Sequence, residues 1–279
     1  MLDKALELIK TILTLGKEPQ SFISARWILF ILWICPSFCK RKCALWIISL
    51  SPHYFYRHIN PAYATMSLGN FLEKEYSRNQ STREKIAKQV LQLYLTEDDT
   101  IMDYGCGPGF LAKASSLYVR KVYATDISTG VIACARIINK SRNIEYFCTT
   151  KKDFHGLKSN CIDKIYSIAV VQHMTNSAFK GMLKQCKNLL KNNGLLIMQI
   201  QLDNDTWRTE KDYREDKTLS GKLRFKYALH GFARKKIEFE KILQEFDFKI
   251  INLLPIKDLV EEDFDDVCKQ HLLVVKKDC

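Results

Sequence analysis

The chain has 279 residues, a formal net charge of +12 and 47% hydrophobic residues, with only 11 glycines and 6 prolines. These proportions exclude disordered, collagen-like and low-complexity proteins, and the length suggests one large domain, or one domain with an appendage. Ten scattered cysteines and the lack of a secretory leader pattern predict a reduced, cytoplasmic protein. Cys35, Cys39 and Cys43 are spaced to share one helix face, but this spacing is not typical of zinc sites, so we expect no metal.

Residues 1–80 differ in character from the rest of the chain. An amphipathic opening is followed by two apolar runs, each far shorter than the ~20 residues that a membrane-spanning helix needs. Trp27, Trp33 and Trp46 lie in these runs beside basic residues, as in helices at a membrane interface. Two interpretations stay open: a helical cap packed on the main domain, and peripheral membrane contact through residues 21–50.

From residue 81 onward, predicted strands alternate with predicted helices. Ser81 to Glu84 have the pattern of a capping box, which predicts the start of a helix whose inner face carries Ile86, Val90 and Leu93. The alternation predicts a parallel sheet with helices on both faces, while the charge-rich stretch 203–234 fits no element. The expected strands are 100–104, 121–125, 144–149, 163–171, 195–202, 247–255 and 269–276, the expected helices are 110–118, 128–139, 176–191 and 235–245, and a turn is expected at 192–194.

A glycine-rich loop at 103–109 follows the first of these strands and precedes a helix. Glycines there allow a tight turn and a close approach of the backbone to a ligand. A dinucleotide site would need glycine in place of Phe110, and Asp103 would repel a pyrophosphate but attract an ammonium group. Asp126 ends the next strand, about twenty residues beyond the loop, where a carboxylate accepts bonds from ribose hydroxyls. An adenosine with a positively charged amino-acid tail, S-adenosylmethionine, fits both carboxylates.

The sequence resembles the class I S-adenosylmethionine-dependent methyltransferases, the seven-stranded family, over about residues 81–279. The resemblance implies a three-layer, Rossmann-like, doubly wound α/β sheet with an antiparallel last strand. Residues 1–80 are then an N-terminal helical cap or a membrane-interface segment, and residues of about 203–234 are an insertion that covers the acceptor. The motifs that carry it are DYGCGPG (103–109), VYATDIS (122–128), DKIYSIAVVQHM (163–174), LLKNNGLLIMQI (189–200) and HLLVVKK (271–277).

The resemblance, carried over residue by residue, also implies the cofactor site. One position departs from the family: many members have an acidic residue after the third strand, near the adenine, where this chain has Thr149 and Lys151, with Asp153 as the nearest carboxylate. The implied residues are Asp103, Gly105, Cys106, Gly107 and Gly109 for the methionine end, Asp126 for the ribose, Ile127 for the adenine, and Ser167 and Ala169 beneath the sulfonium.

Acceptors in this family lie where the fourth strand ends. His173 and His230 are the candidate catalytic bases, because imidazole titrates near neutral pH and a hydroxyl acceptor must lose a proton. Structural packing is the alternative role for both. The candidate residues that line the acceptor are Gln172, Trp207, Tyr213 and Tyr227.

We therefore expect methyl transfer to a small molecule, on oxygen or else on carbon or nitrogen, with a quinone-like or natural-product acceptor as a subclass. RNA is an alternative acceptor, because of the +12 charge and the basic residues between 208 and 241. A cofactor-binding protein without catalysis is a third alternative. The sequence leaves the oligomeric state open.

Overall fold

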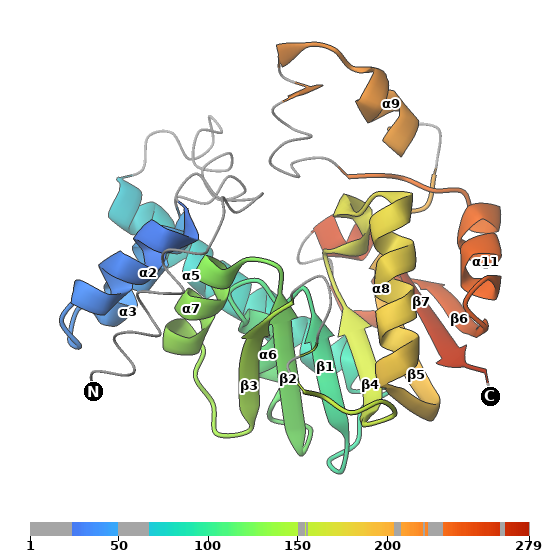
Figure 1. Cartoon of the computed structure of the whole chain (residues 1–279), viewed down its shortest axis with the longest axis horizontal. Helices are drawn as coiled ribbons and strands as arrows, with labels where there is room; N and C mark the ends of the chain where they lie inside the picture. Colours follow the sequence, from blue (N-terminus) through green and yellow to red (C-terminus); the bar gives the residue numbers. More distant parts are fainter. Residues whose placement is uncertain are drawn as a thin grey trace.

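A seven-stranded sheet forms the centre of the protein (Figure 1). The computed structural model describes residues 24–49, 67–149, 154, 156–203, 208–219, 221–222, 231–262 and 266–278. The strand order is β3-β2-β1-β4-β5-β7-β6, in which β1 to β5 run parallel and β7 is antiparallel to both its neighbours. The strands are β1 (Thr100–Tyr104), β2 (Lys121–Asp126), β3 (Ile144–Cys148), β4 (Ile162–Ser167), β5 (Leu190–Ile200), β6 (Phe248–Pro255) and β7 (His271–Lys277).

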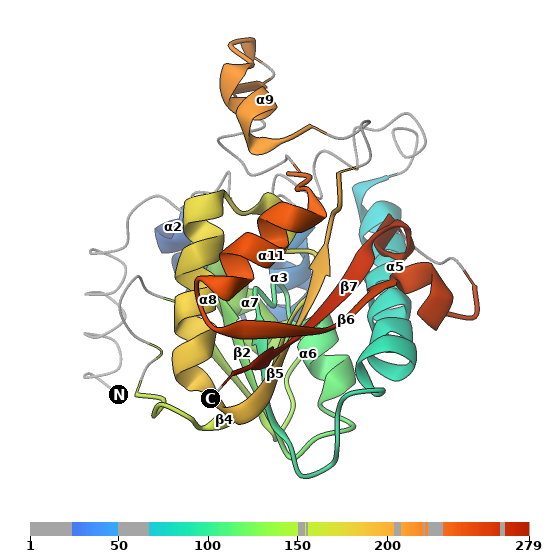
Figure 2. The ribbon, with the colours of Figure 1, turned by 90° about the vertical axis from the view of Figure 1, so that its right-hand side faces the viewer.

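Helices cover both faces of the sheet, so the expected three-layer, Rossmann-like architecture with an antiparallel last strand is confirmed. Figure 2 shows α8 and α11 on one side, with α5 and α6 on the other. The α-helices are α2 (Ala25–Ile34), α3 (Lys40–Ser49), α5 (Leu68–Lys85), α6 (Phe110–Ser115), α7 (Thr129–Ile138), α8 (Asn176–Leu189), α9 (Glu210–Glu215) and α11 (Lys236–Gln244). Shorter turns are a π-helix (Ile86–Leu91) and 3-10 helices at Val171–His173, Ile256–Leu259 and Asp266–Lys269.

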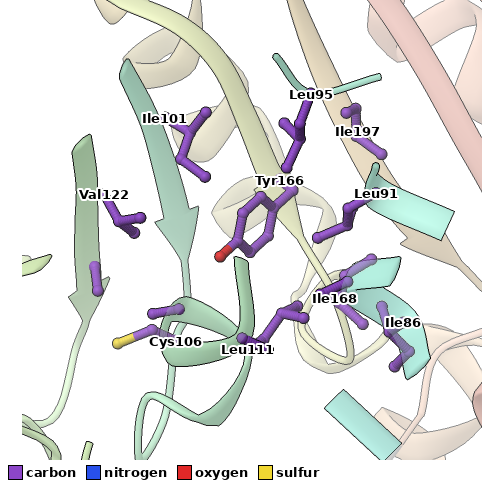
Figure 3. Packing of buried hydrophobic residues seen from close by; sticks show 14 of the residues in the cluster. Ile86, Leu91, Leu95, Ile101, Cys106, Leu111, Val122, Tyr166, Ile168 and Ile197 are labelled. Carbon is purple, nitrogen blue, oxygen red and sulfur yellow. The ribbon is translucent and has the colours of Figure 1, made fainter. Parts of the chain in front are cut away.

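Buried aliphatic and aromatic side chains join the two helical layers to the sheet. Tyr166 of β4 is fully buried, and its hydroxyl hydrogen-bonds with Ser115 of α6 at 2.6 Å. Figure 3 shows Tyr166 among side chains of β1, α6 and the π-helix, with Cys106 at one edge of the group. On the opposite face, Phe179 of α8 packs edge-on against Phe239 of α11, with ring centroids 5.8 Å apart. This packing fixes the ends of β1 and β4, which hold the site.

The helix predicted to begin at Ser81 begins at Leu68 instead. The side chain of Ser67 caps it by accepting a bond from the Asn70 backbone, so the pattern at 81–84 lies inside α5. The chain then continues as a π-helix, whose wider turn rotates the following residues. Ile86 and Val90 are buried as predicted, but Leu93 is 62% exposed. The capping-box prediction and the predicted burial of Leu93 are therefore wrong.

Two strand boundaries also differ from those expected. β4 ends at Ser167 rather than at residue 171, because the next residues leave the sheet and form a 3-10 helix. Leu190 already pairs with β4, and a register irregularity accommodates Asn193 at a φ of 64°, so the expected turn at 192–194 lies inside β5. The charge-rich stretch holds a short helix, α9, which the sequence did not indicate.

α2 and α3 form a helical hairpin beside α7. Apolar side chains of both helices, Ile28 and Ile47 among them, pack against Ile138 of α7. Cys35, Cys39 and Cys43 do not share one helix as predicted, because α2 ends before Pro36 and α3 starts at Lys40. Among the described residues, no helix combines the length and the apolar character that crossing a membrane requires.

Candidate cofactor and acceptor site

The glycine loop lies at the point where the sheet reverses its strand order. β1 has β2 on one side and β4 on the other, and open α/β sheets bind ligands in the crevice at such a point. The backbone amides of Gly105 and Cys106 both donate to the Thr125 carbonyl of β2, at 2.8 and 2.9 Å. The loop is thus held against β2.

Each loop glycine has a left-handed backbone, but the three meet different surroundings. A Cβ at Gly105 would lie 2.5 Å from a methyl of Val170, and one at Gly109 would lie 2.5 Å from the hydroxyl of Tyr146. A Cβ at Gly107 would meet no heavy atom within 4 Å. Gly105 and Gly109 are therefore required by the protein's own packing, whereas Gly107 borders open space.

Because of this difference, we expect a side chain at Gly109 to affect mainly stability and one at Gly107 to affect mainly cofactor binding. Gly109→Ala combines strain at φ +82° with a collision, so we expect it to lower the free energy of unfolding by about 2–3 kcal/mol. Gly107→Ala is the matched variant: it should cost only about 1 kcal/mol of backbone strain but weaken cofactor binding severalfold. Urea denaturation and calorimetric titration measure the two effects. Equal losses of stability in both variants would contradict the assignment.

Asp103, near the end of β1, is a buried carboxyl group, one oxygen of which forms no hydrogen bond with the described residues. Its side chain is 2% exposed, and its Oδ2 has no hydrogen-bond partner among the described residues. Burial raises its pKa to about 8, although the positive charge of Arg83 and a bond from Tyr166 lower it. A buried acceptor without a partner is costly, so this oxygen is available to accept a hydrogen bond from a ligand.

Asp126, at the end of β2, organises the glycine loop through backbone hydrogen bonds. Its Oδ2 accepts from the Gly107 amide at 3.0 Å, and its Oδ1 accepts from the Ser128 amide at 2.9 Å. Burial raises its pKa, and these backbone bonds oppose the shift. Each carboxylate oxygen has a second lone pair, so both can still accept a bond from a hydroxyl group.

The other predicted cofactor residues contribute in different ways. The Cys106 side chain is buried in the core, which leaves only its backbone for a ligand (Figure 3). Ser167 is also buried, and its hydroxyl donates to the Tyr104 carbonyl at 3.0 Å, so it joins β4 to β1. Ile127 is 55% exposed, as expected for an apolar surface that meets a ligand. Ala169 has a φ of 62°, and its amide donates to Gln199 Oε1 at 2.7 Å.

The predicted acceptor residues follow the end of β4. Gln172 is 7% exposed, and its Oε1 has no hydrogen-bond partner among the described residues. Nε2 of Gln201, just beyond β5, is likewise buried without a partner among the described residues. His173 is half-buried at the end of the 3-10 helix. The two glutamines place polar atoms without partners among the described residues near the carboxyl ends of adjacent strands.

Tyr213, on α9, packs within the segment that follows β5. Its ring meets Phe232 edge-on with centroids 5.6 Å apart, and the Arg208 guanidinium lies 4.5 Å above its ring. It therefore contributes at least to the packing of this segment. His230, Trp207 and Tyr227 lie outside the described residues, as do Lys151 and Asp153.

Two arginines of this region were not identified from the sequence. Arg83, read there as part of a capping box, is close enough to Asp103 for its charge to lower the pKa of that carboxyl. Arg234 is 3% exposed, and its guanidinium donates to Asn176 Oδ1 at 2.7 Å and to the carbonyls of Val171 and Met174. No sequence signal marks either one, because their partners are distant along the chain.

Comparison with known proteins agrees with this geometry. Residues 102–198 match the family model described as "Methyltransferase domain". The chain is 27% identical over 141 residues to sphingolipid C9-methyltransferase B of Emericella nidulans, covering 50% of this chain and 28% of that protein. It is 33% identical over 106 residues to the ubiquinone biosynthesis O-methyltransferase of Glaesserella parasuis, covering 35% of this chain and 43% of that protein. The chain thus spans less than half the length of these curated relatives.

Solved structures with the same fold include two methyltransferases. One chain of a complex between a Haloferax volcanii methyltransferase activator and a methyltransferase aligns with a TM-score of 0.53 at 13% identity, covering 73% of this chain and 95% of that one. A TehB-like S-adenosylmethionine-dependent methyltransferase from Corynebacterium glutamicum aligns with a TM-score of 0.51 at 14% identity, covering 79% and 100%. At these identities the likeness shows the fold alone. Together with the seven-stranded sheet and the family match, which covers residues 102–198, it supports a class I methyltransferase domain that uses S-adenosylmethionine.

Proposed function

We propose that the protein transfers a methyl group from S-adenosylmethionine to a small, apolar molecule that carries a polar reacting group. The observation that carries this proposal is the set of buried polar atoms without partners among the described residues, at Asp103, Gln172 and Gln201. They lie at or just beyond the carboxyl ends of β1, β4 and β5, which are neighbours in the sheet. Asp103 is oriented for the cofactor, and the two glutamines can bind the acceptor.

The residues present fit the cofactor. Asp103 would accept bonds from its ammonium group, Asp126 from its ribose hydroxyls, and the open space at Gly107 admits its close approach. Arg83, beside Asp103, would bind its carboxylate. When bound, the cofactor supplies an electrophilic methyl on a sulfonium. The residues of this chain then have to align the acceptor and exclude water.

His173 is our candidate for the general base, because it follows β4 on a short helix that Arg234 holds in place. A base is needed when the acceptor is a hydroxyl, and general-base catalysis contributes roughly 10²–10⁴-fold. We expect His173→Ala to lower turnover by a factor in that range with cofactor affinity unchanged. Initial rates with methyl-labelled cofactor and calorimetric titration test this. A fully active variant would remove His173 as the base.

Two features favour an apolar small molecule. The relatives include a protein named for a sphingolipid and one named for ubiquinone biosynthesis. In addition, at least four of the eleven basic residues between 208 and 241 form ion pairs with carboxylates, which weakens the case for RNA. These ion pairs are Arg208 with Asp216, Lys211 with Glu215, Arg214 with Glu210, and Lys236 with Glu240.

The test begins with calorimetric titration of the full chain with S-adenosylmethionine and S-adenosylhomocysteine, with NAD as the control. Methyl transfer from labelled cofactor is then measured with quinols, phenols, sphingolipids and RNA. Transfer to one of the apolar molecules supports the proposal. Binding without transfer to any of them would favour a non-catalytic role, and transfer to RNA alone would overturn the choice of acceptor.

A further inference from the structure

The outer side of the α2–α3 hairpin exposes a group of large apolar side chains. Within α2, Ala25, Ile28 and Leu32 are buried and face the domain, whereas residues on the opposite side point outward. We call this outward group the aromatic face. Its members, with their exposed fractions, are Trp27 (61%), Phe30 (39%), Trp33 (59%), Ile34 (56%), Phe38 (86%) and Trp46 (47%).

The aromatic face is continuous along α2. The rings of Trp27 and Phe30 are 6.0 Å apart between centroids and nearly perpendicular, and those of Phe30 and Trp33 are 6.4 Å apart. Scattered exposed apolar residues are normal on a soluble protein, but a contiguous group of this size marks an interaction surface. Phe38 extends the group into the turn between the two helices.

Positive charge surrounds this surface. Residues 24–49 contain four basic and no acidic side chains: Arg26, Lys40, Arg41 and Lys42. Arg26, Arg41 and Lys42 are exposed. Two copies of the chain that met through this face would bring like charges together, which opposes self-association. An anionic surface complements it instead.

We propose that the aromatic face lies in the headgroup region of a bilayer that contains anionic phospholipid. Tryptophan and phenylalanine on one side of a helix, with lysine and arginine at its border, are the composition of helices that lie in a membrane interface. α2 has 10 residues, or about 15 Å at 1.5 Å per residue, so it can lie in the interface but cannot span the bilayer. The inference stands independently of the proposed acceptor.

The hairpin is coupled to the cofactor loop through α5. Arg41 of α3 donates to the Tyr76 hydroxyl at 2.5 Å, and its guanidinium lies 5.1 Å from the centre of that ring. Tyr76 in turn packs edge-on against Phe110, which directly follows Gly109 of the loop, with centroids 5.3 Å apart. Figure 1 shows α2 and α3 beside α7, on the β3 side of the sheet. A bilayer at the hairpin would therefore lie close to the methyltransferase site.

The test is co-sedimentation of the full chain with vesicles of phosphatidylcholine, with and without phosphatidylglycerol, at low and high salt. We expect binding that requires phosphatidylglycerol, weakens with salt, and shifts the tryptophan emission to shorter wavelength. Trp27→Ser/Trp33→Ser should abolish binding, and Lys40→Gln/Lys42→Gln should weaken it roughly thirtyfold, since each basic residue near the surface contributes about fivefold.

Ile237→Ser on α11 is the matched control, because Ile237 is 66% exposed but lies outside the aromatic face. It should bind vesicles like the parent protein. Circular dichroism shows whether each variant is folded. Absence of sedimentation with either vesicle, equal binding by the tryptophan variant, or binding indifferent to phosphatidylglycerol would overturn the inference. If the protein forms a dimer without lipid and Trp27→Ser/Trp33→Ser makes it monomeric, the aromatic face binds a second copy of the chain instead.

Discussion

Asp103→Asn should weaken the binding of S-adenosylmethionine by about 3 kcal/mol, a factor of ~100, and at the same time stabilise the cofactor-free protein. Affinity falls because the substitution removes the negative charge from the oxygen that has no partner among the described residues. Stability rises because the parent protein must keep a 2% exposed carboxyl group protonated, or ionise it in the core, whereas the unfolded chain ionises it freely. Few substitutions in a structural core would have these two effects together.

The stabilisation should depend on pH in a defined direction. The pKa of Asp103 is raised from 3.8 to about 8 in the folded protein. The folded state therefore holds a proton that the unfolded state has released, and the parent protein loses stability as the pH rises from 3.8 through 8. Asp103→Asn removes this loss, so its advantage is small at about pH 4, grows as the pH rises, and is largest at about pH 8.5. Urea denaturation at both values measures it.

Asp99→Asn is the matched control for this prediction. Asp99 is a buried carboxylate directly before β1, at the opposite end of the strand from the glycine loop, and it pairs with Lys164. Its substitution should lower stability and leave cofactor affinity unchanged, because the lost partner is structural. If Asp103→Asn binds the cofactor like the parent protein, or destabilises it at both pH values, the assigned role of Asp103 is wrong.

Arg234→Met should destabilise the protein by about 3–5 kcal/mol. The guanidinium is 3% exposed and donates to Asn176 Oδ1 and to two main-chain carbonyls, which would be left without that donor. It also lies 5.6 to 6.0 Å from the ring centres of Phe179, Phe232 and Phe239. Burial lowers its pKa, yet arginine stays charged at any physiological pH. Chemical denaturation gives the change in the free energy of unfolding.

Arg234 should also affect catalysis, because the carbonyls that it binds, those of Val171 and Met174, flank His173. At temperatures at which the variant is still folded, Arg234→Met should lower turnover more than it lowers cofactor affinity. A residue that only stabilised the fold would not have this selective effect. Arg234→Lys keeps the charge without the planar fork and should recover part of the stability. A Met variant with parental stability and turnover would refute this positioning role.

The ends of β1 and β2 could be predicted from local sequence. Thr100 to Tyr104 and Lys121 to Asp126 are short, mostly apolar strands, and each is followed by residues that turn the chain. The positions of the glycine loop and of Asp126 were predictable for the same reason, because they depend on backbone freedom and on where a strand ends, both of which are local properties.

The first part of the domain shows where local reasoning fails. The residues from Ser81 to Glu84 have the composition of a helix start, but Ser67 caps the helix earlier and the apolar contacts of the π-helix continue it beyond Lys85. The π-helix also moved Leu93 to the surface. In a π-helix a backbone amide donates to the carbonyl five residues earlier, as the amide of Gln92 does to Ala87. Such a bond depends on tertiary packing and leaves no periodic pattern of apolar residues in the sequence.

By itself, the sequence therefore determined the parallel sheet and the positions of the glycine loop and Asp126 at strand ends, because periodicity and strand ends are encoded by neighbouring residues. Only the tertiary structure decided which side chains meet. Arg83 lies beside Asp103, Arg234 holds the segment around His173, and the tryptophans of α2 point outward while Ile28 points inward. Each of these depends on packing between segments far apart in the chain, which residue spacing alone cannot specify.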